Sequence, residues 1–218
     1  MTEARGVPRF PGYDVLSQRS HWDAETYAAV MERLAPHLQR SFFSEAEERI
    51  CRPLLDRLLA NDDEGRQVPV FEMIDLRLAT GSTDGWRYAD MPPDAEAWRR
   101  SLAELERLSF ASAGRPRQQQ MLEAVRTSDK FAGMPAPRLW SLWLRYTCTA
   151  YYSHPWAWNE IGFGGPAYPR GYKNIGIDRR EPWEVQEVDA HDPIPWAQRV
   201  EAARHRHGDP ERQAGSRP

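Results

Sequence analysis

Cysteine is scarce in this chain. Cys51 and Cys148 are the only two, and each lies within an apolar pattern of helical spacing. There is no Cys-x-x-Cys-His run to attach a c-type haem, and no cysteine spacing suits zinc. We therefore expect two small, buried, apolar side chains, and the sequence leaves open whether they form a disulfide.

Long apolar runs and an excess of charge are also missing. No stretch is apolar over the length needed to cross a membrane. The formal net charge of -3 is close to neutral, so nothing favours a nucleic acid or direct insertion into a membrane. Arg5 and Arg9 precede no apolar run, so residues 1–19 are not expected to form a secretory or twin-arginine signal. Taken alone, the sequence predicts a cytoplasmic location, or export attached to another protein.

The common catalytic motifs are absent as well. The chain has no Gly-x-Ser-x-Gly, His-Glu-x-x-His, phosphate-binding loop or dinucleotide fingerprint. His154 follows a predicted helix, where a histidine usually caps the last carbonyl groups. Glu160 has no second carboxylate to work with, so we expect it to be a hydrogen-bonding anchor. His205 and His207 lie in a polar tail. We expect no catalytic residue, metal site or cofactor site in this chain.

Helical patterns dominate the part of the chain that is regular. Asp23 and the pair Ser44 and Glu47 have the positions of helix caps, the second as a capping box. With apolar residues at helical spacing, they predict an all-α fold, an irregular bundle of six or seven helices with no convincing strand. The predicted helices cover residues 23–34, the stretch after Ser44 to residue 59, and residues 68–78, 93–108, 116–128 and 138–152.

The chain is therefore divided into four parts. The prediction is an extended N-terminal arm (1–22), a helical domain (23–152), an irregular strap (153–197) and a disordered polar tail (198–218). The helix over 138–152 is apolar in nearly every direction, which is typical of a helix central to a core or held between two bodies.

The strap is rich in aromatic residues, glycine and proline. Its glycines and prolines disfavour a helix, whereas a disordered linker would lack the aromatic rings, which include several of the nine tryptophans. We expect four residues to shape its path, with Gly165 at a positive φ; they are Gly164, Gly165, Pro166 and Gly171.

Three interpretations of the strap stay open on physical grounds. It could pack on its own helical bundle, or Trp156, Trp158 and Tyr168 could stack against a sugar ring. It could also dock onto a partner protein, with aromatic anchors and Arg170 entering the partner's pockets. The long arms at both ends favour docking, because arms that do not pack into the protein's own core usually wrap around a partner.

The strap also carries a family resemblance. The run from residue 151 to 172 resembles the C-terminal signature of the gluconate 2-dehydrogenase subunit 3 family. Upstream, Phe42-Phe43-Ser-Glu-Ala-Glu followed by residues 50–59 is similar to an early helix of that family, and Gln118-Gln119-Gln120-Met-Leu to a later one. The likeness covers roughly residues 41–172.

The resemblance implies a small subunit, without a cofactor of its own, of a flavin-dependent dehydrogenase. Its large partner would be a glucose–methanol–choline type flavoprotein that carries FAD and oxidises a sugar, a sugar acid or a related alcohol. Some members of the family add a cytochrome c subunit. The small subunit wraps, stabilises and matures the large one and often carries a twin-arginine signal, which residues 1–19 here do not show; export to the periplasm or cell envelope would then depend on the partner.

The leading hypothesis is therefore a non-catalytic dehydrogenase subunit. An autonomous carbohydrate-binding module that uses the tryptophans of the strap is the alternative. Under the leading hypothesis the predicted partner contacts are Trp156, Trp158, Asn159, Tyr168, Arg170 and Tyr172.

Overall fold

The computed structural model describes residues 10–35, 39–60, 68–167, 171, 181 and 184–185. Within these ranges it confirms the predicted all-α class. The elements, in chain order, are η1 (Val15–His21, a 3-10 helix), α1 (Ala24–Leu34), α2 (Glu45–Leu59), α3 (Val70–Ala79), α4 (Asp94–Arg107), α5 (Arg115–Thr127), β1 (Lys130–Phe131), β2 (Met134–Pro135), α6 (Ala136–Ser153) and α7 (Pro155–Ile161).

The small hairpin of β1 and β2 was not predicted. The two strands pair antiparallel, and the turn between them places Ala132 at φ 51° and Gly133 at φ 73°. Positive φ at both central residues is what a type I′ hairpin turn requires. The strands are only two residues long, so they carry too little alternation to be recognised in the sequence.

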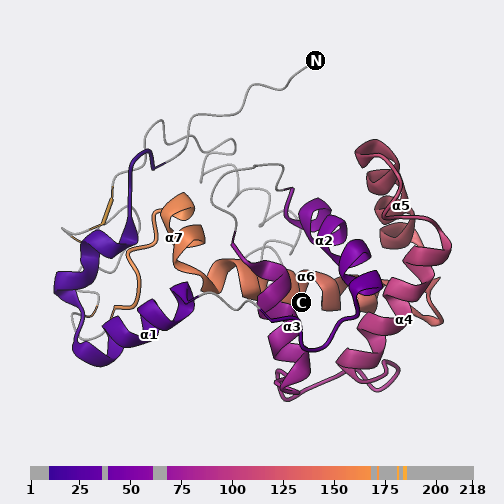
Figure 1. Cartoon of the computed structure of the whole chain (residues 1–218), viewed down its shortest axis with the longest axis horizontal. Coiled ribbons are helices and arrows are strands. Elements are labelled where there is room, and N and C mark those ends of the chain that lie inside the picture. Colours follow the sequence, from indigo (N-terminus) through magenta and orange to yellow (C-terminus); the bar gives the residue numbers. More distant parts are fainter. Residues whose placement is uncertain are drawn as a thin grey trace, which may run out of the picture.

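Helix α6 is the central element of the molecule. Figure 1 shows it along the long axis, with α2 to α5 gathered at one end and η1, α1 and α7 at the other. Its side chains Leu139, Trp143 and Tyr146 are fully buried in the main core, which α2 to α5 close around them. This confirms the expectation of a helix central to the core, although its buried residues lie on one face and Ser141 and Thr149 are exposed. None of the helices in the described ranges is long and apolar enough to cross a bilayer.

The predicted helix caps are present. The Asp23 side chain accepts a hydrogen bond from the Thr26 N–H, 2.8 Å away, and Ser44 and Glu47 form both bonds of the capping box. A further anchor was not foreseen: Asp75 of α3 is completely buried. Its carboxylate accepts three backbone N–H groups of residues 41–43, which lead into α2.

A second, smaller core lies at the other end of α6. Four buried side chains form it, and they come from η1, its flank, α1 and α7: Val15, Trp22, Val30 and Trp158. We call η1, α1 and α7 the N-terminal lobe, since residues 10–34 supply most of it. Residues near the N-terminus and the helix that follows α6 thus meet on one hydrophobic cluster.

Two sequence predictions are wrong in this lobe. Residues up to 22 were expected to be extended, yet Val15–His21 form a 3-10 helix whose N-cap is Asp14. The strap was expected to be irregular from residue 153, yet Pro155–Ile161 form α7. Proline is tolerated in a first helical turn because its missing N–H has no intrahelical partner there, and Gly162 ends the helix in the left-handed conformation. The glycine and proline residues flank this helix and do not interrupt it.

Both cysteines are free. Cys51 is completely buried and Cys148 is half-buried, and burial raises the pKa of the Cys51 thiol. The polar tail (198–218), residues 1–9 and most of the strap beyond residue 167 lie outside the described residues.

Candidate partner-binding segment

His154 is the junction between α6 and α7. It is 1% exposed, and its Nδ1 accepts a hydrogen bond from the backbone N–H of Trp156 at 3.2 Å. The imidazole and the Trp156 ring meet edge to face, with 4.8 Å between ring centroids. As expected, the histidine caps the end of α6: its backbone N–H donates to the Tyr151 carbonyl at 3.2 Å. Its side chain in addition caps the start of α7. Because Nδ1 is already an acceptor inside the chain, that nitrogen is not available as a base.

Glu160 is a hydrogen-bonding anchor, as predicted. The Tyr151 hydroxyl donates to its carboxylate and so joins the end of α6 to α7. Burial, followed by this hydrogen bond, raises the pKa of Tyr151. Both groups with acid–base potential in this segment therefore have structural contacts within the chain.

Trp158 and Asn159 hold α7 to the N-terminal residues. Trp158 is 4% exposed; its indole N–H donates to the Tyr152 carbonyl at 2.7 Å, and the Arg33 guanidinium lies 5.6 Å from its ring centroid. The Asn159 Oδ1 accepts the backbone N–H of Val15 at 2.7 Å. In this structure both side chains contact their own chain, and Trp158 has no open ring face to offer to a sugar. Their contact with a partner stays a prediction.

The other predicted partner contacts fall in different surroundings. Trp156 is half-buried against the main core. Tyr168, Arg170 and Tyr172 lie outside the described residues. Of the predicted set, the described members all belong to α7, with Trp158 and Asn159 on the N-terminal lobe and Trp156 on the main core.

Glycine does shape the chain after α7. Gly165 has a φ of 78°, as predicted from the sequence, and a Cβ built there would lie 2.7 Å from Cζ2 of Trp22. Gly171 has a φ of 68° with open space around it. Gly164 is buried and Pro166 half-buried. The close approach of the chain at Gly165 lets residues 164–166 lie directly against the N-terminal lobe.

Gly162 has a similar role, and its place as a helix cap was not predicted from the sequence. Its φ is 66°, and an added Cβ would lie 2.5 Å from the ring of Phe10. The signal was available, because a glycine directly after a helix is typical of a left-handed C-cap. It was overlooked because α7 itself was not predicted.

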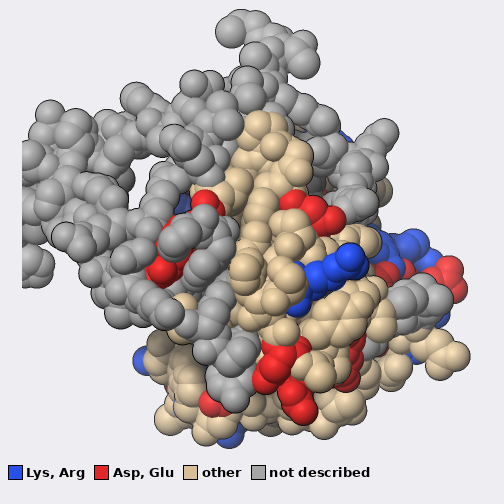
Figure 2. Space-filling view, turned by 90° about the vertical axis from the view of Figure 1, so that its left-hand side faces the viewer, with Lys and Arg blue, Asp and Glu red and all other residues tan. Residues whose placement is uncertain are grey.

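The end of the molecule formed by this lobe is shown in Figure 2. Its central part is a band of uncharged side chains, bordered by Asp and Glu on several sides and by Lys or Arg on the right. Near α7, Tyr152, Ile161 and Phe163 are 50%, 45% and 36% exposed. No three His, Cys, Asp or Glu side chains in the described ranges are grouped so that they could hold a metal ion.

The fold of the described residues defines the class of protein: a mostly helical chain whose two lobes are joined by the central helix α6. Residues 45–165 match the family model of gluconate 2-dehydrogenase subunit 3, which confirms the resemblance seen in the sequence. The chain belongs to this family and is accordingly a subunit of a dehydrogenase complex. No curated protein and no solved structure matches it. The matched segment runs from the first residue of α2 to Gly165, so η1 and α1 lie outside it.

Proposed function

We propose that this chain is the non-catalytic small subunit of an FAD-dependent dehydrogenase, and that it binds, stabilises and helps to mature the large flavoprotein subunit. The family match over residues 45–165 carries this proposal. The large subunit would be of the glucose–methanol–choline type and would hold the FAD and oxidise a sugar, sugar acid or related alcohol. A cytochrome c subunit would complete the complex in some cases.

The chemistry of the described residues supports an accessory role. The two side chains with acid–base potential in the aromatic segment are used inside the fold: His154 caps α7, and Glu160 accepts from Tyr151. The segment is therefore built to be held in place, which suits a subunit that presents a fixed surface to a partner. We propose that the location of the chain follows that of its partner.

Co-expression tests this function directly. The chain, with an affinity tag, is produced with a glucose–methanol–choline type flavoprotein encoded beside it, and the visible spectrum of the eluted protein is recorded. We expect the tagged chain alone to be colourless and the co-expressed sample to contain both chains and show flavin absorbance. If the small chain also aids maturation, the flavoprotein produced without it will be less soluble and will contain less flavin. A colourless tagged chain that elutes without the flavoprotein would contradict the proposal.

A further inference from the structure

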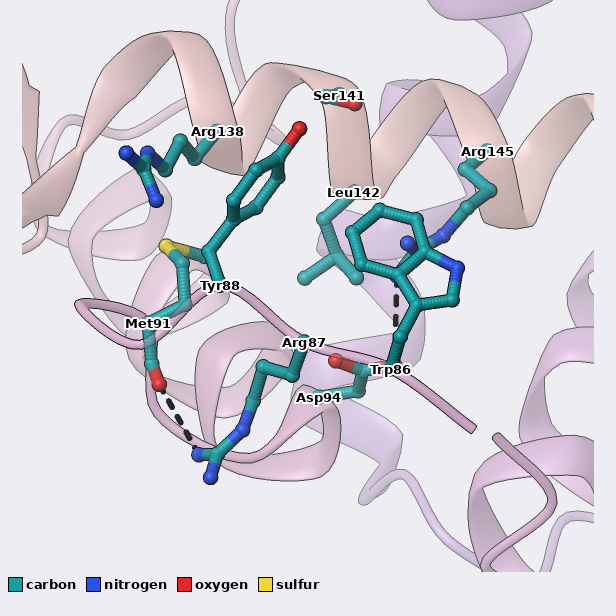
Figure 3. A pocket seen from close by; sticks show the side chains of 9 residues that line it. All are labelled: Trp86, Arg87, Tyr88, Met91, Asp94, Arg138, Ser141, Leu142 and Arg145. Carbon is teal, nitrogen blue, oxygen red and sulfur yellow. Dashed lines mark hydrogen bonds and ion pairs between the residues drawn. The ribbon is translucent and has the colours of Figure 1, made fainter. Parts of the chain in front are cut away.

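Two aromatic side chains stand out on the surface of the larger lobe. Trp86 and Tyr88 lie on the loop between α3 and α4 and are 50% and 41% exposed. Their rings meet edge to face, with centroids 5.3 Å apart and an interplanar angle of 89°. Figure 3 shows both rings against the side of α6 that carries Arg138 and Arg145.

Each ring is held by an arginine of α6. The Arg145 guanidinium carbon lies 4.5 Å from the Trp86 ring centroid, and that of Arg138 lies 4.2 Å from the Tyr88 centroid. Such cation–π contacts stabilise the ring positions on an exposed surface.

Carboxylates fix the two arginines in turn. Arg145 pairs with Asp84 at 2.9 Å and with Asp94 at 3.6 Å, and Arg138 pairs with Asp90 at 2.5 Å. The aromatic rings are therefore ordered before any partner arrives. Binding through ordered side chains loses less conformational entropy, and this makes the patch suited to recognition.

The patch is not shaped to hold a small molecule. The space enclosed among its side chains is about 10 Å³, which is room for about one water. A sugar ring needs a far larger concave site. Trp86 projects from the loop, so its natural counterpart is a recess on another protein. Tryptophan, tyrosine and arginine are also the residue types in which interface hot spots are enriched.

One charge in the patch lacks a counterion. Arg87 is exposed, and its guanidinium donates to the Met91 carbonyl at 3.0 Å (Figure 3). No carboxylate in the described part of the chain pairs with it, whereas Arg138 pairs with one carboxylate and Arg145 with two. A partner that covers the patch is expected to place an acidic group opposite Arg87, because a cation buried without a counterion is costly.

We infer that this patch, made of Trp86, Arg87 and Tyr88 on the loop between α3 and α4, docks the large flavoprotein subunit, with Trp86 in an apolar recess and Arg87 against a carboxylate of that subunit. The inference rests on the proposed function. It favours the flavoprotein over other partners because the patch lies inside the segment that matches the family. A role shared by the family must be carried by that segment, whereas η1 and α1 fall outside it.

Binding measurements with full-length variants test the inference. The dissociation constant for the co-expressed flavoprotein is measured for wild type, Trp86→Ala, Arg87→Glu and Arg87→Lys. We expect Trp86→Ala to weaken binding by about 30-fold or more, as at an interface hot spot. Arg87→Glu should weaken it by about tenfold or more through charge repulsion, while Arg87→Lys, which retains the charge, should stay within a few-fold of wild type.

Tyr27→Ala is the matched control. Tyr27 is an aromatic residue of 41% exposure on α1, outside the matched segment, and its removal should leave binding unchanged. Thermal melting followed by circular dichroism checks that the variants fold. Arg87→Glu keeps the test decisive even if Trp86→Ala loosens the loop, since the Arg87 side chain makes a single hydrogen bond.

Failure of the inference and failure of the proposed function give different results. If wild type binds the flavoprotein and both Trp86→Ala and Arg87→Glu bind equally well, the docking site is wrong and the function stands. If wild type does not bind, the proposed function fails and the docking site with it. Equal weakening by Tyr27→Ala would show that the effect is not local and would overturn the inference. So would a sugar-dependent tryptophan fluorescence change in the isolated chain that Trp86→Ala abolishes.

Discussion

Gly165 is a position where both the backbone conformation and the packing require glycine. Its φ of 78° is in the left-handed region, and a Cβ there would lie 2.7 Å from the Trp22 ring and 3.3 Å from Val15. We predict that Gly165→Ala lowers the free energy of unfolding by about 2–4 kcal/mol, since left-handed strain and overpacking add. Urea unfolding followed by circular dichroism measures this change.

The variant Gly81→Ala separates the effect of left-handed backbone strain from that of overpacking. Gly81 has a φ of 67° but no atom within 4 Å of an added Cβ, so only backbone strain of about 1 kcal/mol is expected. Equal losses in the two variants would show that the contact with Trp22 contributes nothing.

Asp75 is a second residue whose single side chain holds a neighbouring backbone segment in place. Its carboxylate oxygens lie 2.5 Å from the Ser41 nitrogen, 3.1 Å from that of Phe42 and 2.8 Å from that of Phe43. Asp75→Asn replaces one acceptor oxygen with an N–H donor that faces these N–H groups. We predict a loss of about 2–3 kcal/mol in the free energy of unfolding, because a buried polar group is left without its partner.

Glu45→Gln provides the comparison for Asp75→Asn in the same urea titrations. Glu45 is an exposed carboxylate whose side chain is 76% accessible and pairs with Arg49 at 3.3 Å. An exposed pair of this kind contributes little, so the expected change is within about 0.5 kcal/mol. If the two variants unfold alike, the buried carboxylate does not hold residues 41–43 as we argue.

At the scale of elements, α7 and the N-terminal helices depend on each other. Their shared core has only four buried side chains, so this lobe belongs to the low-stability end of the molecule. The hydrogen bond from the Val15 N–H to Asn159 is one of its polar contacts between distant parts of the chain, and the bond from Arg33 to the Ser153 carbonyl is another. The lobe should therefore open without unfolding of α2 to α6.

Asn159→Ala tests this mutual dependence. The Val15 N–H loses its acceptor, and we predict that the opening free energy of amides in α1 falls by about 1–2 kcal/mol. Native-state hydrogen exchange measures it, with the amides of α4 as internal reference. A matching loss of protection in α4 would mean that the two lobes unfold as one unit.

At the scale of the whole molecule, a buried tyrosine couples stability to pH. The Tyr146 hydroxyl donates to Asp94 at 2.7 Å in the main core, and burial, followed by this hydrogen bond, raises its pKa. As pH rises past the unfolded value of about 10, the unfolded chain loses this proton while the folded chain keeps it. The free energy of unfolding must therefore fall as pH rises through that range.

Tyr146→Phe should flatten this alkaline dependence. We predict a variant that is less stable than wild type near neutral pH, because Asp94 loses its donor, but that loses less further stability between about pH 9 and 11. Urea unfolding at several pH values measures both slopes. Some slope will persist, because the pKa of Tyr151 is raised as well; parallel curves for variant and wild type would exclude a contribution from Tyr146.

The sequence by itself determined the features that depend on near neighbours in the chain. The Asp23 cap, the capping box of Ser44 and Glu47, the apolar character of α6 and the positive φ of Gly165 were all predicted and are present. Each depends on residues within a turn or two, so local spacing is sufficient to recognise it. The family signature is also a property of a continuous run.

Tertiary structure alone decided which surfaces meet. Val15 and Asn159 are 144 positions apart in the chain, and no local pattern shows that a 3-10 helix near the N-terminus covers Trp158 and α7. The same holds for Trp86, which reads as one residue of a turn-rich loop until Arg145 of α6 is placed against it. The burial of a side chain and the residues that it contacts depend on distant segments of the chain. These contacts form only when the chain has folded.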